Sequence, residues 1–205
     1  MNLNLMKSIG PGLLVGCALL TTGCSSKNSV ETQASDADRD SATIVEGQSP
    51  SEASKTQMLA AKDALFMKLS GRLMEAMTNQ GPAAAITVCQ KEAPAIAKTV
   101  SDEKGLQIGR TGVRLRNPNN VAPAWAKELV QDKIDTPTFV SLDNGHSAAL
   151  LPINLKAQCL MCHGPKDEIA PVIQEQLTKL YPDDQATGFK EGELRGWFWI
   201  ENPSS

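Results

Sequence analysis

The sequence predicts an α+β fold, in which helices flank an antiparallel sheet. In its first part, apolar side chains recur every three or four positions, as an amphipathic helix requires, at Met58, Leu65, Phe66, Leu69, Leu73 and Met77. Later segments instead show the alternating or β-rich pattern of strands, around Leu106, Phe139, Leu150 and Trp197. Helical patterns and strand patterns in different parts of one chain favour α+β over an all-helical fold.

The predicted helices have ordinary start and stop signals. Residues 79–81 (Asn-Gln-Gly) end the first helix, and Pro82 opens a second that we expect to reach about Lys98. Shorter helices are predicted for residues 123–133 and 171–180, each opened by a proline. All four therefore have boundaries that can be compared with a structure.

The predicted strands follow the second helix. The first begins near Leu106, and the next two cover residues 138–142 and 148–153. The turn between this pair contains Asn-Gly at residues 144–145, which favours a tight hairpin. A last strand is predicted for residues 192–200, with bulky apolar side chains available for burial.

Length and charge set limits on the class of protein. The 205 residues are 41% hydrophobic and 21% charged, which fits one globular domain with extensions. The net charge of −3 gives no electrostatic argument for a nucleic-acid partner. No paired carboxylates, nucleophile–base arrangement or nucleotide-binding loop is recognisable, so we do not expect an enzyme.

The N-terminus has the features of an export signal. Lys7 precedes an apolar run, residues 13–20, that is too short to span a bilayer. Residues 21–24 (Thr-Thr-Gly-Cys) resemble a bacterial lipobox, which predicts removal of residues 1–23 and lipidation of Cys24; a plain secretory signal is the alternative. We therefore expect a membrane-anchored lipoprotein facing the periplasm in the cell envelope. The absence of aspartate after Cys24 favours the outer membrane.

The mature chain divides into two parts. Residues 24–55 are mostly polar, with sparse apolar residues in no regular pattern, and we expect them to form a flexible tether. Residues 56–202 contain every predicted helix and strand, and form the expected domain.

A Cys-x-x-Cys-His motif carries the chemistry of the chain. Two thiols at Cys159 and Cys162 have the spacing to form thioethers with the vinyl groups of one haem, and His163 then supplies an imidazole to the iron. The cysteine pair alone would also suit a redox disulfide or half of a zinc site. Zinc needs four ligands, and the sequence has no second Cys-x-x-Cys or His pair. The motif therefore predicts one covalent haem c.

Cys89 is left over once the other cysteines are assigned. Cys17 leaves with the signal peptide, Cys24 takes lipid, and the motif uses the remaining two. Cys89 is then either a buried small apolar residue or the second axial ligand of the iron, through its thiolate. His146, the only other histidine besides the motif's, is the next candidate ligand.

Three arginines lie in and after the first predicted strand, before the strand predicted for residues 138–142. Arg110, Arg114 and Arg116 have two interpretations: they contact the haem propionates, which a guanidinium can bind through two hydrogen bonds, or they form a solvated strand face.

Several segments together resemble one family: a small exported c-type haem domain with a PAS-like fold, formerly a domain of unknown function. The resemblance covers residues 56–202 and includes Val88-Cys89, Gly109-Arg110-Thr111, Leu150-Leu151-Pro152-Ile153, the Cys159–Gly164 motif, Tyr181-Pro182-Asp183 and Gly188 to Gly196. It implies a PAS-like antiparallel sheet flanked by helices, and iron ligation by His163 and Cys89.

The function expected from motif and resemblance is electron transfer or redox sensing by a mono-haem c-type protein. The redox partner protein is unknown. One alternative is a haem-based gas or ligand sensor that acts through a separate partner, since the sequence contains no recognisable kinase. A second alternative is a thiol-disulfide lipoprotein without haem.

Overall fold

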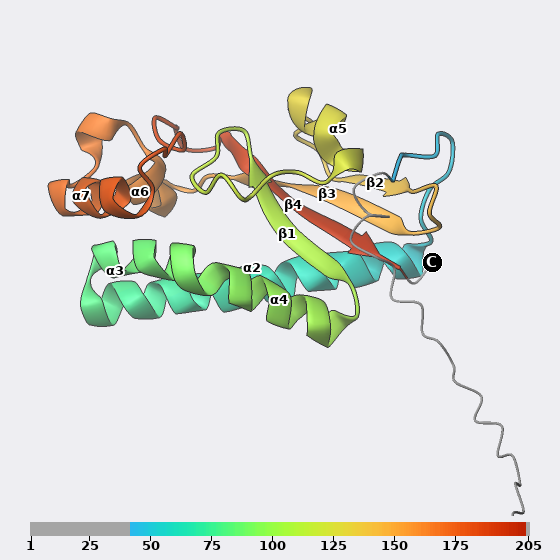
Figure 1. Ribbon diagram of the computed structural model, residues 1–205, viewed down its shortest axis with the longest axis horizontal. Coiled ribbons are helices and arrows are strands. Elements are labelled where there is room, and N and C mark those ends of the chain that lie inside the picture. The colour runs from blue at the N-terminus through green and yellow to red at the C-terminus, as the bar shows by residue number, and fades with distance from the viewer. Residues whose placement is uncertain (1–41, 204–205) are drawn as a thin grey trace, which may run out of the picture. The chain divides into compact units, whose positions relative to one another are not determined.

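The computed structural model describes residues 42–203. Their centre is a four-stranded antiparallel sheet in the order β1-β4-β3-β2 (Figure 1). The strands are β1 (Gln107–Gly112), β2 (Thr138–Ser141), β3 (Ser147–Asn154) and β4 (Leu194–Asn202). The α+β prediction is confirmed, with all four strands near their predicted positions, whereas the PAS-like description stays a prediction.

One face of the sheet packs against a layer of helices. This layer contains α2 (Glu52–Gln80) and α4 (Ala93–Lys104), which lie side by side below the sheet in Figure 1. Three of the predicted positions, Met58, Leu65 and Leu69, are buried, whereas Phe66 is exposed. Met58 and Leu65 pack against Ile108 and Phe198 of the sheet. The α2 helix begins at an N-cap, where the Ser51 hydroxyl accepts a hydrogen bond from the Ser54 amide at 3.1 Å.

The opposite face is covered by shorter segments, η2 (Ala124–Ala126) and α5 (Lys127–Gln131), in place of the single predicted helix 123–133. Trp125 packs there against Leu150 and Trp197. β4 is therefore buried on both sides: Phe198 and Ile200 face the α2 layer, and Trp197 faces Trp125. Burial on two faces explains the run of consecutive apolar residues from Trp197 to Ile200.

The predicted second helix is interrupted at Cys89. It consists of α3 (Pro82–Thr87), a π-helical segment η1 (Val88–Glu92) and α4, which extends beyond Lys98 to Lys104. Pro94 explains the interruption, because it has no N–H to donate and its ring clashes with the carbonyl one turn earlier. The Ala93 amide instead donates to the carbonyl of Val88, five residues back. Gly105, with φ of 66°, ends α4 in the left-handed conformation.

Part of the segment expected as a tether is packed in the structure. Ala42 is buried, Ile44 forms a β-bridge with Leu142, and α2 begins at Glu52. The packed region thus starts earlier than residue 56, because apolar Ala42 and Ile44 extend the cluster formed by residues of the β2–β3 hairpin. The predicted signal peptide, Cys24 and the rest of the expected tether lie outside the described residues.

The chain leaves β3 at the end of the sheet that carries the Cys-x-x-Cys-His motif. It continues through η3 (Ala157–Cys159), α6 (Leu160–His163) and η4 (Lys166–Glu168) into α7 (Pro171–Leu180), which packs beside α3. Figure 1 shows α6 and α7 beyond the end of the sheet, above α3. Within residues 42–203, no helix is long and apolar enough to cross a membrane.

Candidate functional site

The two ring nitrogens of His163 differ: Nδ1 is hydrogen-bonded to a backbone carbonyl, and Nε2 is left available to bind a metal. Its Nδ1 lies 2.7 Å from the carbonyl oxygen of Ala186, and a carbonyl can only accept, so Nδ1 carries the proton. The neutral imidazole therefore presents a lone pair at Nε2. Burial, followed by the positive charges of Arg116 and Arg195, lowers the pKa of His163 well below its ordinary value. The ring is thus held in the protonation state that a metal ligand needs.

The segment from Ala186 to Phe189 runs alongside the motif and braces it. The amide of Gly188 donates to the carbonyl of Gly164 at 2.7 Å, and the amide of Phe189 donates to that of His163 at 3.0 Å. The Phe189 ring also packs edge-on against the His163 ring, with 6.4 Å between centroids. Backbone and side-chain contacts together fix the orientation of the imidazole.

Arg116 ties the motif to this brace from the other side. It is 7% exposed, its Nε is 3.0 Å from the Asp184 carboxylate, and one terminal nitrogen donates to the carbonyls of Cys162 and Ala186 at 2.5 and 3.3 Å. Asp184 in turn accepts the Ala186 amide at 2.7 Å. The ion pair is therefore a buried structural centre that holds both the motif and the acceptor of the His163 hydrogen bond.

A cavity of about 210 Å³ lies beside the motif, between α2 and the motif end of the sheet. Cys159 and His163 contribute to its wall, and α2 contributes a mostly apolar side, with Phe66, Leu69, Ser70 and Leu73. Phe66 lines this cavity and is 49% exposed. The cavity is apolar on the helix side and cationic on the sheet side, which suits a flat amphipathic ligand.

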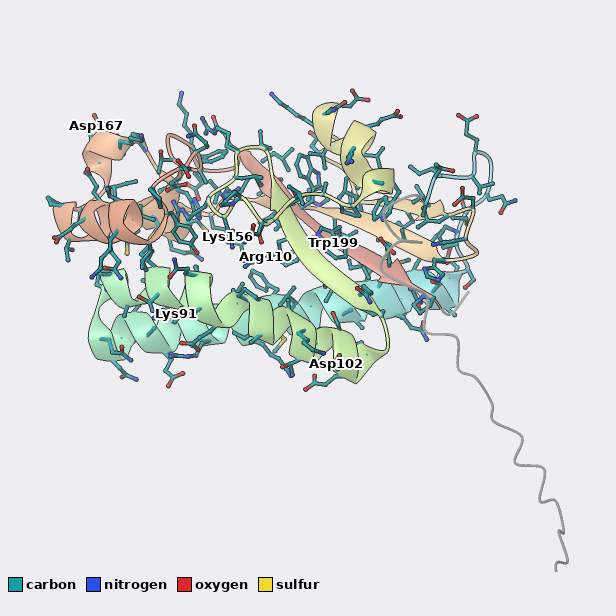
Figure 2. The ribbon with its side chains drawn as sticks, viewed as in Figure 1. Lys91, Asp102, Arg110, Lys156, Asp167 and Trp199 are labelled. Atoms are coloured by element: carbon teal, nitrogen blue, oxygen red, sulfur yellow. The ribbon has the colours of Figure 1, made fainter. Side chains whose placement is uncertain are left out.

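Three arginines provide that cationic side: Arg110, Arg116 and Arg195. Arg110 shares the face of β1 with Ile108, toward the helix layer, as Figure 2 shows. Within residues 42–203, Arg116 has an ion-pair partner, whereas Arg110 forms no ion pair and Nε of Arg195 is buried without a hydrogen bond. Burial lowers the pKa of Arg110, and burial followed by Arg116 lowers that of Arg195 to about 10. The cavity wall therefore carries more positive than negative charge.

The structure separates the three predicted arginines. Arg110 and Arg116 line the cavity, but Arg116 is already engaged with Asp184. Arg114 is exposed and its guanidinium lies over the Phe189 ring at 3.9 Å. β1 ends at Gly112, so the alternation expected to continue through Arg116 gives way to a loop. Contact with propionates stays a prediction for all three.

Cys89 lies in the π-helical segment, and two side chains that follow it tie this segment to neighbouring helices. Gln90 donates from its amide to the carbonyl of Leu180 at 2.8 Å, and Glu92 accepts two hydrogen bonds from Arg72 at 2.7 and 2.9 Å. Burial raises the pKa of the Cys89 thiol, while Arg110, Arg116 and Arg195 oppose this increase. The charges of these arginines therefore act on Cys89, although Cys89 itself does not line the cavity.

Cys162 and Cys89 belong to one electrostatic neighbourhood. Burial raises the pKa of Cys162, Arg116 opposes the increase, and Cys89 adds to it. Cys162 also packs against the apolar cluster of Ile86 and Tyr181, which joins α3 to α7. The fold therefore brings residue 89 to the motif across more than seventy positions of sequence.

His146 lies far from this site. It precedes β3 at the hairpin turn, whereas the motif follows the other end of the same strand, eight residues long and so roughly 23 Å across. Its Nδ1 is 4.0 Å from the Glu201 carboxylate, itself hydrogen-bonded to Trp125 at 2.8 Å. One iron bound to His163 is out of reach of His146.

Three site residues were not singled out from the sequence. Arg195 and Asp184 are ordinary surface residue types, and only their burial beside the motif reveals a role. Tyr181 is 6% exposed, and burial followed by the charge of Cys89 raises its pKa to about 12. Tyr181 and Arg195 fall within segments that carry the family resemblance, which was the available signal for both.

Fold and site together define an α+β domain that places two thiols and an oriented imidazole beside an arginine-lined cavity. The family model for the Tll0287-like family matches residues 23–203. The chain therefore belongs to the Tll0287-like family.

A solved structure supports the fold. The cyanobacterial haem protein Tll0287 superimposes with a TM-score of 0.55 at 24% sequence identity, covering 76% of this chain and 98% of that one. At this identity the likeness shows the shared fold. No curated protein matches the chain.

Proposed function

We propose that this protein binds one covalent haem c and transfers electrons or senses redox state as a lipid-anchored protein of the cell envelope. The observation that carries the proposal is the hydrogen bond of Nδ1 of His163 to the carbonyl of Ala186, which leaves Nε2 available as a ligand. His163 and Cys159 both line the cavity. Family membership and the haem protein of the same fold support it.

The residues present fit a haem. Cys159 and Cys162 are free thiols at the attachment spacing, and the His163 tautomer is the one that can ligate iron. The unpaired Arg110 and the unpartnered Nε of Arg195 supply donors for carboxylates, and the α2 wall supplies an apolar face. Bound iron would supply a one-electron redox couple.

The chain's own residues have distinct roles in this proposal. His163 and Cys89 would hold the iron, Cys159 and Cys162 would make the thioethers, and Arg110 and Arg195 would bind propionate groups. Phe66 and Leu73 would contribute to the apolar wall that limits access of water. Arg116 and Asp184 hold the motif and the Ala186 acceptor in register, which fixes the imidazole. No enzymatic step is part of the proposal.

The test of covalent attachment is extraction with acidified acetone after expression with the haem-attachment machinery. The colour should stay with the polypeptide, and its mass should increase by one haem. Cys159→Ser should lower the yield of coloured protein, because only one thioether remains. Complete loss of haem to the organic layer would refute attachment, and a protein without a Soret band would favour the disulfide alternative.

Gas sensing is the second candidate function, and the π-helical segment at Cys89 favours it. Such segments are rare overall, and those that occur are often found at functional sites, where a local change of helical register can move a side chain. A carrier should keep both axial ligands in both oxidation states, whereas a sensor should bind CO or NO readily when reduced. Optical spectra of the reduced protein under CO separate the two functions.

The membrane anchor is a separate prediction about Cys24. The native protein should fractionate with membranes, because a multiply acylated cysteine gives stable attachment. Cys24→Ser should release the protein or block its maturation, and Ser25→Ala should leave fractionation unchanged as a control. Wild-type protein that is wholly soluble and begins at Ser25 or later would contradict the lipoprotein proposal.

A further inference from the structure

We propose that Gln90 and Glu92 are positioning residues for Cys89, which hold the π-helical segment against α7 and α2 so that the thiolate meets the iron. This inference rests on the proposed function, because it takes Cys89 as the ligand opposite His163. Gln90 and Glu92 contact Leu180 and Arg72, and they act on Cys89 by holding the backbone of the segment in place.

The backbone alone fixes this segment less firmly than an α-helix would. Pro94 cannot donate a hydrogen bond into the preceding turn, and the Ala93 amide reaches back five residues to Val88. Contacts from outside the segment must therefore select the orientation of Cys89.

Gln90 supplies the first such contact. Its amide donates to the carbonyl of Leu180, the last residue of α7, at 2.8 Å. Carbonyls in the last turn of a helix lack an intrahelical donor, so this acceptor is available without disturbing α7. The bond joins the residue after Cys89 to the residue before Tyr181, within the cluster that also contains Cys162.

Glu92 supplies the second contact, in a different direction. Its two carboxylate oxygens accept from Nε and a terminal nitrogen of Arg72 at 2.7 and 2.9 Å, a bidentate pair with fixed geometry. Arg72 is the neighbour on α2 of Leu73, which lines the cavity. Ties to α7 and to α2 from residues one and three positions after Cys89 fix both the position and the rotation of the segment.

The experiment compares Gln90→Ala, Glu92→Ala and the double variant as full-chain holoproteins. The first readout is the rate at which imidazole displaces the thiolate from ferric iron, followed by loss of the thiolate low-spin EPR signal. The second is hydrogen exchange of the amides of residues 88–93, which reports on the segment independently of the iron. Glu103→Ala is the matched control, since Glu103 pairs with Lys68 at 2.7 Å and ties α4 to α2 away from Cys89.

We expect each single variant to accelerate displacement about threefold and the double variant about tenfold, because each removes one partly exposed tie. The amides of residues 88–93 should exchange faster in the same variants, and most in the double variant. Glu103→Ala should match the wild type in both readouts. The exchanged pair, Arg72→Glu with Glu92→Arg, should restore the slow rate.

The outcomes separate this inference from the proposed function. A wild-type protein with no thiolate signal overturns the ligation and this inference together. A normal wild-type signal with wild-type displacement rates in all variants overturns the positioning role alone. Faster hydrogen exchange without faster displacement also overturns it, because the ties would then order the segment without serving the ligand.

Discussion

Arg116→Ala should destabilise the domain by about 3–5 kcal/mol, the usual consequence of removing one partner of a buried ion pair. Asp184 would keep its charge with a side chain only 10% exposed. The carbonyl of Cys162 would lose the Arg116 donor, and that of Ala186 would keep only the His163 donor. Thermal unfolding of the holoprotein should shift downward by roughly 10 °C or more, on the usual scaling for a domain of this size.

Arg114→Ala is the matched control for this prediction, because Arg114 lies on the same loop but is exposed and only covers the Phe189 ring. It should cost less than about 1 kcal/mol. Adding Asp184→Asn to Arg116→Ala should recover part of the loss, since the unpaired charge is removed. If Arg116→Ala unfolds at the temperature of Arg114→Ala, the buried pair does not hold the site together.

Local signals in the sequence were sufficient for the elements of the fold. The spacing of Met58, Leu65 and Leu69 marks the buried side of α2, and the Asn-Gly turn marks the β2–β3 hairpin. The π-helical segment was missed. Pro94 is compatible with the first turn of a new helix and with a preceding π turn, so its presence alone does not tell the two apart. Residues 42–45 were missed because this segment, with three apolar side chains, is too short to show a period.

The site was predictable where covalent chemistry fixes spacing and less so where the fold creates proximity. Cys159, Cys162 and His163 lie within five residues of sequence, so the motif alone predicts their role. Asp184 and Arg195 join the site only because β4 and the loop before it return to the motif, and no local pattern reports burial of a charged residue. Cys89 was proposed by elimination among the cysteines, which is a counting argument independent of the fold, and its ligation of iron stays a prediction.

Replacing Cys89 with alanine should abolish the thiolate-type low-spin signal of the ferric protein and raise its reduction potential. An anionic sulfur ligand stabilises ferric over ferrous iron, so its loss favours the reduced state. Burial raises the pKa of this thiol, and Arg110 and Arg116 only partly oppose the effect, so bonding to iron must keep the sulfur ionised. The haem should remain attached through Cys159 and Cys162, which EPR, potentiometry and mass spectrometry check on one sample.

Val88→Ala is the control for Cys89→Ala, because it removes buried methyl groups from the same π-helical segment and leaves the sulfur in place. It should lower stability by about 1–2 kcal/mol while keeping the thiolate signal and the potential. An unchanged ferric spectrum in Cys89→Ala would make Cys89 a packing residue. The ligand opposite His163 would then have to come from elsewhere than His146, which lies at the far end of β3 beside Glu201.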